Sequence, residues 1–192
     1  MTMENVKNWI LASLVFALIS SCTDNKKTNK DLESFMNKKI AIPYESMDVR
    51  FCSFFSDSLS SNDDISIIVV FSDSGCSGCK IKEYSIIEQI CIEKYNHANI
   101  TYIVPCPKAE SKNIFTMFCN SRIEGVVCID TCNAFLHANP HFPDNELFHT
   151  FVINNEGKVL MVGNPFQNEK MEALFKKVIA NEQKKQKKKR PA

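Results

Sequence analysis

The 192-residue chain contains only five glycines and one tryptophan, and its charges nearly cancel to a net +1. So few glycines form no loop of the kind that cradles phosphates, and nucleotide chemistry is therefore not expected. The balanced charge gives no general reason to expect nucleic acid as a partner. The most apolar stretch, Trp9 to Ile19, covers eleven residues, which is too short for a confident membrane span. About 170 residues remain after it, enough for one domain with a real core.

Residues 1–21 have the features of a signal peptide. A polar start that includes Lys7 precedes the apolar stretch, and Ile19-Ser20-Ser21-Cys22 follows it. An aliphatic residue, two small residues and a cysteine resemble the lipobox of bacterial lipoproteins. The resemblance implies cleavage before Cys22 and attachment of a lipid to this residue. An ordinary secretory signal with a chance cysteine is the alternative, and it predicts export as well.

Two of the nine cysteines stand in the motif Cys76-Ser77-Gly78-Cys79. The motif lies between Ile65–Phe71, which predicts a buried strand, and Ser77–Asn96, which predicts a helix. A thiol in such a turn is exposed and faces unpaired backbone N–H groups and the positive end of the helix dipole, which lower its pKa. The spacing also allows the two sulfurs to close into a disulfide. This layout is typical of a thiol–disulfide active site.

Six cysteines fall outside both motifs, and no spacing among them completes a zinc site. In an oxidising compartment they could pair, but the connectivity cannot be deduced from the sequence. The helical spacing of its neighbours predicts that Cys91 is a buried free thiol. The six are Cys52, Cys91, Cys106, Cys119, Cys128 and Cys132.

The pattern along the chain predicts an α/β protein, a three-layer α/β/α sandwich with a mixed central sheet. We expect a tether over residues 22–35, one domain over residues 36–181, and a basic disordered tail over residues 182–192. Within the domain, the further predicted elements are a short strand Lys39–Pro43, a loop Cys52–Asp64, a strand Ile100–Val104, a helix Ser111–Cys119, a strand Val126–Ile129, a hairpin of Phe148–Ile153 and Lys158–Val162, and a helix Asn168–Asn181.

Two stretches carry a resemblance to the thioredoxin superfamily, and more narrowly to membrane-anchored, periplasm-facing thioredoxin-like lipoproteins of the TlpA-like type. They are Phe71-Ser72-Asp73-Ser74-Gly75-Cys76-Ser77-Gly78-Cys79-Lys80 and His149-Thr150-Phe151-Val152-Ile153-Asn154-Asn155-Glu156-Gly157-Lys158-Val159. The resemblance implies a thioredoxin-like fold with no cofactor. It also implies that Cys76 is the attacking thiolate and that Cys79 is the resolving, more buried thiol. Ser77 and Gly78 would keep the turn small.

The sequence departs from that family at two places. Gly75 stands where a tryptophan usually precedes the first cysteine. His149, or Phe148 after a shift of one residue, stands where the family carries a cis-proline opposite the dithiol. His149 is either a polar residue on a half-exposed strand or a group that tunes or shields Cys76.

The expected function is therefore that of a membrane-tethered thiol–disulfide oxidoreductase. Its expected partners are a protein substrate or redox partner in the cell envelope and the membrane itself, reached through the lipid on Cys22; no nucleic acid is expected. The expected location is lipid-anchored and facing the periplasm, with inner or outer membrane left open. Two alternatives remain: a catalytically inactive thioredoxin-fold binding module, and a metallochaperone that holds Cu(I) through Cys76, Cys79 and His149.

Overall fold

The computed structural model describes residues 28–36, 38–52, 65–72, 78–95 and 99–189. The chain divides into two compact units, residues 1–35 and 36–192. In the first unit, the described residues are helical from residue 28 onward. They belong to the segment that the sequence assigned to a tether, and the rest of that segment lies outside the described residues.

The second unit contains a six-stranded mixed sheet with the strand order β1-β4-β3-β2-β5-β6. Neighbours among β2, β3 and β4 are parallel, whereas β1, β5 and β6 pair antiparallel with their neighbours. The strands are β1 (Asp48–Phe51), β2 (Ile65–Val70), β3 (Asn99–Pro105), β4 (Val126–Asp130), β5 (Thr150–Asn154) and β6 (Val159–Val162).

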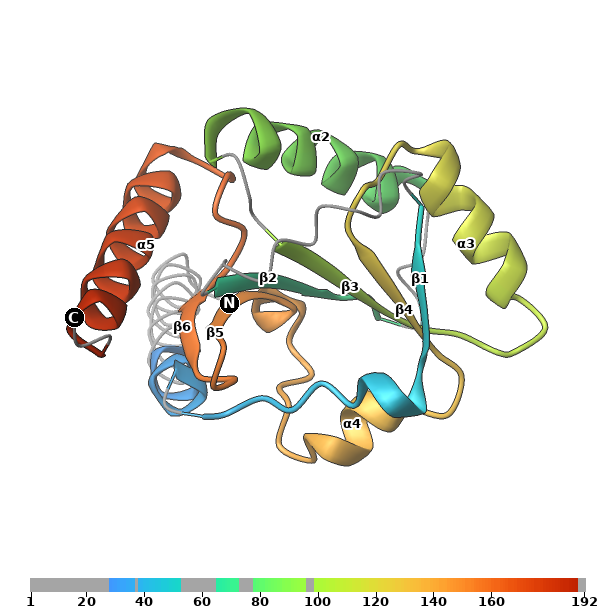
Figure 1. The fold of residues 1–192 in the computed structure, drawn as a ribbon. Coiled ribbons are helices and arrows are strands. Elements are labelled where there is room, and N and C mark those ends of the chain that lie inside the picture. Colours follow the sequence, from blue (N-terminus) through green and yellow to red (C-terminus); the bar gives the residue numbers. More distant parts are fainter. Residues whose placement is uncertain (1–27, 37, 53–64, 73–77, 96–98, 190–192) are drawn as a thin grey trace, which may run out of the picture. The chain divides into compact units, whose positions relative to one another are not determined.

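Helices lie on both faces of this sheet, with α2 and α3 above it and α4 below it in the view of Figure 1. The helices are α2 (Gly78–Tyr95), α3 (Ser111–Asn120), α4 (Ala134–Ala138) and α5 (Glu169–Lys189), with 3₁₀ turns at η1 (Tyr44–Ser46) and η3 (Glu146–Phe148). The expected α/β/α sandwich with a mixed sheet is confirmed. Among the described residues, no helix is both long and apolar enough to cross a membrane.

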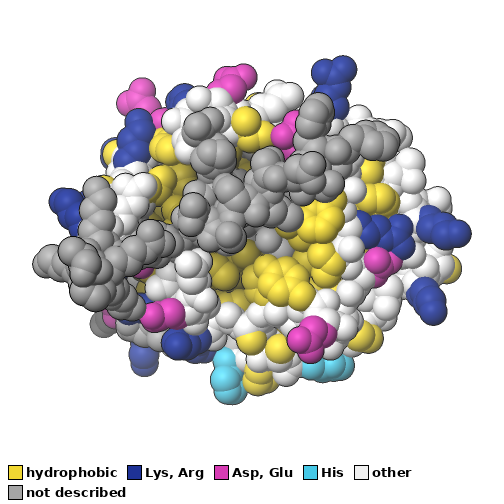
Figure 2. Space-filling model, viewed as in Figure 1, with side chains coloured by type: hydrophobic (Ala, Val, Ile, Leu, Met, Phe, Trp, Pro, Cys, Tyr) yellow, Lys and Arg dark blue, Asp and Glu magenta, His cyan; other side chains and the backbone are white. Residues whose placement is uncertain are grey.

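The central strands are almost wholly apolar because both faces of the sheet are covered. Side chains alternate between the faces, so Ile67 and Val69 of β2 join the core beneath α2, while Val70 lines a cavity with residues of α4. On the α2 side, the ring of Phe71 meets Tyr84 at 5.7 Å and Phe118 at 5.6 Å between centroids. Hydrophobic side chains also gather in the middle of the face seen in Figure 2, with Lys and Arg toward its margin.

Several predicted elements differ from the observed ones. The predicted strand Lys39–Pro43 is only an isolated bridge between Lys39 and Lys158. The sequence prediction missed strand β1 and helix α4 altogether. The predicted disordered tail over residues 182–192 is wrong as far as the structure describes it, because α5 continues to Lys189.

The hairpin of β5 and β6 is confirmed, although its first strand begins at Thr150 rather than Phe148. The turn depends on Asn154, whose side-chain oxygen accepts hydrogen bonds from the backbone N–H groups of Glu156 and Lys158 at 3.0 and 2.9 Å. Gly157 has φ of +76°, a conformation that glycine adopts without strain. Any Cβ at this position would lie 2.5 Å from the carbonyl oxygen of Ile40. Both the positive φ and the lack of space therefore require glycine at this position.

Candidate functional site

The candidate site lies where the chain leaves the interior strand β2 and enters helix α2. Cys79 is the second residue of α2, and its side chain is exposed. The expectation that Cys79 is more buried than Cys76 stays a prediction, because Cys76 lies outside the described residues. Three further predicted site residues, Cys22, Cys76 and Ser77, lie outside the described residues.

Gly78 is the first residue of α2, and it is exposed. The nearest atom to a Cβ built at this position is Cε of Met117 in α3, at 3.7 Å, which is an ordinary van der Waals distance. A Cβ at residue 78 would therefore not be crowded, and the predicted role of Gly78 in keeping the turn small has no steric basis among these contacts. The contact does show that α3 borders the start of α2.

His149 lies between η3 and β5, with φ of −78° and ψ of −6°. The interpretation of His149 as a residue on a half-exposed strand is therefore wrong. Its backbone carbonyl accepts a hydrogen bond of 2.8 Å from the N–H of Val70, the last residue of β2. Its Nε2 lies 3.1 Å from the carbonyl oxygen of Pro143, and its ring stacks at 5.3 Å against Phe142. These contacts fix the ring beside the carboxyl end of β2.

A network of polar side chains joins η3 to the start of α2. The carboxylate of Glu146 accepts hydrogen bonds from the hydroxyl of Ser72 at 2.8 Å and from Nζ of Lys80 at 3.2 Å. The bond from Ser72, together with the bond and charge of Lys80, lowers the pKa of Glu146. Since Lys80 directly follows Cys79, this carboxylate links the loop of His149 to the residue next to the exposed thiol.

Two cavities flank the end of β2, and Val70, Phe71, Ser72 and His149 line both of them. The first, here called the apolar cavity, has a volume of about 210 Å³ and is lined further by residues of α4 and the loop after it. The second, here called the charged cavity, has a volume of about 160 Å³ and is lined by Lys80, Glu83, Tyr84 and Glu146 among others.

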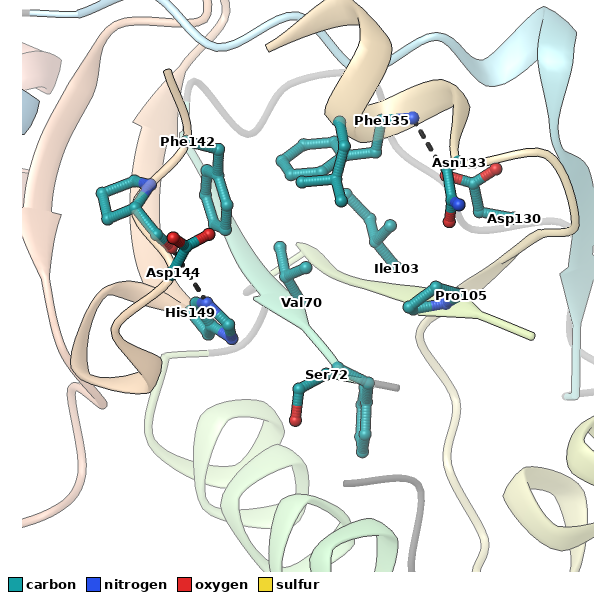
Figure 3. Close-up of a pocket in the computed structure, with 13 residues that line it drawn as sticks. Val70, Ser72, Ile103, Pro105, Asp130, Asn133, Phe135, Phe142, Asp144 and His149 are labelled. Atoms are coloured by element: carbon teal, nitrogen blue, oxygen red, sulfur yellow. Dashed lines mark hydrogen bonds between the residues drawn. The ribbon is translucent and has the colours of Figure 1, made fainter. Parts of the chain in front are cut away.

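Figure 3 shows how the apolar cavity is built, with His149 and Asp144 on one side and Asp130 and Asn133 on the other. The side chains of Val70, Ile103, Phe135 and Phe142 lie between these polar groups. The wall formed by α4 is held by Asp130 at the end of β4. Its buried carboxylate accepts hydrogen bonds from the N–H groups of Ala134 and Phe135 at 2.8 and 2.9 Å.

The remaining described cysteines differ sharply in exposure. Cys91 is free and fully buried, as predicted, and burial raises its pKa to about 12. Cys128 is buried within β4, and burial raises its pKa to about 12 as well. Cys132 is exposed in the turn after β4. Of the described cysteines, the buried ones are thus poor nucleophiles.

The described part of the chain holds no group of three or more His, Cys, Asp or Glu side chains arranged to bind a metal ion. The Cu(I) alternative also requires Cys76, which lies outside the described residues, so it stays a prediction. Sequence reasoning missed Glu146, Asp130 and the aromatic Phe142. Glu146 lies in a short turn, Phe142 lies in a loop, and Asp130 ends strand β4, so only the fold brings them to the end of β2.

No protein-family model matches this sequence, and no curated protein is detectably similar to it. Solved structures with a related backbone include an uncharacterized thioredoxin-like protein from Porphyromonas gingivalis, at 18% identity and a TM-score of 0.41 over 61% of this chain and 74% of that chain. A putative thiol:disulfide interchange protein DsbE from Chlorobium tepidum is 13% identical, with a TM-score of 0.43 over 61% and 81%. Bacterioferritin comigratory protein from Xanthomonas campestris is 14% identical, with a TM-score of 0.42 over 60% and 81%. Because these scores are low, the strand order and helix positions above remain the basis of the fold assignment.

Proposed function

We propose that this chain is a thioredoxin-like thiol–disulfide oxidoreductase that exchanges disulfides with proteins of the cell envelope through Cys76 and Cys79. One observation carries the proposal: the exposed thiol of Cys79 lies at the start of a helix that follows an interior strand of the sheet. An exposed thiol at this place is available to a second sulfur three residues away and to a substrate.

In the proposed reaction, the Cys76 thiolate attacks one sulfur of a substrate disulfide. The S–S bond of the substrate breaks, a mixed disulfide forms on Cys76, and one substrate thiolate leaves and takes up a proton. The Cys79 thiol then loses its proton and attacks the Cys76 sulfur, which releases the second substrate thiol. Two electrons pass from the dithiol to the substrate, and Cys76 and Cys79 end as a disulfide.

The surroundings of Cys79 support a protein as the substrate. The apolar cavity offers Val70, Phe135 and Phe142 to an apolar side chain of a bound segment, and the charged cavity offers Lys80 and Glu146 to a polar one. In the proposed complex, the segment that carries the substrate disulfide lies across the end of β2, with His149 beside it. His149 is thus proposed to shield the mixed disulfide from water.

One observation favours the alternative of a binding module without turnover. None of the described peptide bonds is cis, so the bond before His149 is trans. The family that the sequence resembles places a cis-proline there, and this chain has neither the proline nor the cis bond. A module of this kind would use the two cavities for binding and keep its cysteines as a fixed pair.

The reduction potential of the Cys76–Cys79 pair tests the proposal. The full chain is equilibrated in glutathione or dithiothreitol buffers, its free thiols are alkylated, and each cysteine is mapped by peptide mass. We expect a reversible two-electron transition at these two residues between roughly −120 and −270 mV. A pair that shows no transition, or that stays oxidised in strong reductant, would leave the binding module as the function. Cys132→Ser is the matched control, because it removes another exposed thiol.

We further propose that the chain is held at the membrane by a lipid on Cys22, facing the periplasm. The proposal rests on the sequence Ile19-Ser20-Ser21-Cys22. Expression with radiolabelled palmitate tests it: the chain should take up the label and sediment with membranes, and the Cys22→Ala variant should do neither. Export of an unlabelled, unanchored chain would point instead to an ordinary secretory signal.

A further inference from the structure

A second pair of cysteines stands outside the Cys76–Cys79 motif in the sequence. Cys52 follows the last residue of β1, and Cys119 is the penultimate residue of α3. Both cysteines are free and half-buried, and the Cys119 thiol is one of the neighbouring groups that raise the pKa of the Cys52 thiol. The two thiols are therefore neighbours, which is the first requirement for a disulfide between them.

The backbone geometry of the two elements supports this pairing independently. Arg50 stands two residues before Cys52, on the same side of the extended chain, and Phe115 stands one helical turn before Cys119. The guanidinium carbon of Arg50 lies 5.0 Å from the centre of the Phe115 ring. The contact between Arg50 and Phe115 therefore fixes β1 against the face of α3 that also presents Cys119. β1 is further held by its pairing with β4, which contacts α3.

We propose that Cys52 and Cys119 form a second redox couple, which closes into a disulfide between β1 and α3 when the chain meets a small-molecule disulfide such as oxidised glutathione. This couple does not depend on Cys76 or Cys79. Its disulfide closes a loop that contains β2, α2 and β3, and so it encloses the elements that carry the candidate site.

The reaction consists of two exchange steps. The Cys119 thiol loses its proton and attacks one sulfur of the small-molecule disulfide, whose S–S bond breaks; the leaving thiolate takes up a proton. The Cys52 thiol then loses its proton and attacks the Cys119 sulfur, and a second small thiol leaves. The two protein thiols give up two electrons, and one disulfide is reduced to two thiols.

The chemistry of the pair makes this disulfide slow to form and slow to break. Burial and the neighbouring Cys119 thiol raise the pKa of Cys52, with a further contribution from the charge of Glu88. A thiol of raised pKa is seldom ionised near neutral pH, so its attack is slow. Cys52 packs beside the hydrophobic core and Cys119 is half-buried, which limits access for a large protein partner. The couple is thus suited to become oxidised slowly in an oxidising compartment and to stay oxidised, rather than to turn over substrates.

The test uses the full chain with both Cys76→Ser and Cys79→Ser, so that failure of the proposed active site cannot disturb it. In this variant, trypsin yields Phe51–Lys80 with Cys52 as its only cysteine, and Asn113–Arg122 with Cys119 as its only cysteine. After equilibration with oxidised glutathione, we expect a cross-linked mass of these two peptides that disappears on reduction. Separate peptides that each carry glutathione or the alkylating reagent would overturn the proposal, as would a cross-link from either peptide to any other cysteine.

A thermal measurement gives a second readout. Oxidation should raise the Tm of the Cys76→Ser/Cys79→Ser chain by roughly 5–15 °C, because a disulfide across a long loop restricts the unfolded state. Adding Cys119→Ala should remove this rise, whereas adding Cys132→Ser should leave it intact. An equal rise with and without Cys119 would overturn the proposal.

Discussion

Helix α2 places two cysteines in opposite surroundings. At its first turn, Cys79 is exposed and stands next to Lys80, which is paired with Glu146 of η3. Three turns later, Cys91 is wholly buried, and burial raises its pKa to about 12. Between them, Glu88 is a carboxylate in the core, 3% exposed. One helix thus carries an exposed thiol and a buried one, and position rather than cysteine content decides which thiol solvent can reach.

Removing each thiol in turn is the most direct test of this difference between Cys79 and Cys91. Cys79→Ser should reduce the rate of insulin reduction, with dithiothreitol as electron donor, to the uncatalysed rate, because the mixed disulfide proposed to form on Cys76 would no longer be resolved. Cys91→Ala should keep the wild-type rate within about twofold, since a buried, protonated thiol takes no part. A loss of turnover in the Cys91→Ala chain, once its folding is verified by circular dichroism, would contradict the separation of the two ends.

The buried end of α2 should make stability depend on pH. Burial raises the pKa of Glu88 to about 7 from an ordinary value of 4.5, although the N–H groups of Glu124 and Gly125 donate to its carboxylate and oppose the shift. The folded chain therefore holds this proton more tightly than the unfolded chain does. The free energy of unfolding should fall by about 3 kcal/mol as pH rises from 4.5 through 7, with no further change from this group at higher pH.

Urea unfolding at a series of pH values measures this dependence, and Glu88→Gln is the control that cannot titrate. The variant should lose most of the fall between pH 4.5 and 7. If the two chains show the same slope over this range, Glu88 is not the group responsible.

Two glycines, Gly78 at the exposed start of α2 and Gly125 beside Glu88, give a matched pair of substitutions. A Cβ at Gly125 would lie 2.6 Å from both Oε1 of Glu88 and the backbone oxygen of Ile100, whereas a Cβ at Gly78 meets nothing nearer than 3.7 Å. Gly125→Ala should therefore lower the free energy of unfolding by about 2 kcal/mol. Gly78→Ala should raise it by up to about 1 kcal/mol, because it restricts the unfolded chain. If urea unfolding gave the same change in the free energy of unfolding for both variants, the atoms around Gly125 would have to move aside more easily than their close packing indicates.

The smallest effect is expected from the ion pair at the exposed end. Glu146→Gln removes a negative charge beside Lys80 and should speed alkylation of Cys79 by iodoacetamide less than about threefold at low salt. In 1 M salt the two chains should react at equal rates, because exposed charges are then screened. A large change that persists in high salt would show that Glu146 acts by holding η3 in place rather than through its charge.

The sequence predicted those elements whose apolar residues recur with a clear period, and it missed those that depend on distant partners. The strands around Ile67 and Ile103 and helices α2 and α3 were predicted within a few residues. Strand β1 was missed because it has only four residues, Asp48–Phe51, which are mostly exposed at the sheet edge, so their polar–apolar alternation is short and marks no buried face. Helix α4 was not predicted because it has only five residues and depends on Asp130 of β4 to accept hydrogen bonds from its first N–H groups.

Two errors of interpretation have a common physical cause. The run from Lys184 to Lys189 lacks apolar residues and was assigned to a disordered tail, yet lysine and glutamine are good helix formers and extend α5. The alternating character of Phe148–Ile153 predicts a strand that includes His149, whereas the Asn145 side chain accepts a hydrogen bond from the N–H of Leu147 and starts a 3₁₀ turn. In both cases local backbone preferences outweighed the hydrophobic pattern.

The pairing of β2 with β5 has a consequence for how quickly the protein folds. Ile65 of β2 pairs with Asn154 of β5, about 90 residues later along the chain, and β1 and β4 join over a similar separation. Such non-local pairing places refolding on the millisecond-to-second side of the range for small domains, because long loops close before the sheet gains its contacts. During that interval the thiols that end up buried, Cys91 and Cys128, are open to any oxidant that the chain meets. The order in which oxidation and sheet closure occur therefore determines which sulfur atoms remain reduced in the finished protein.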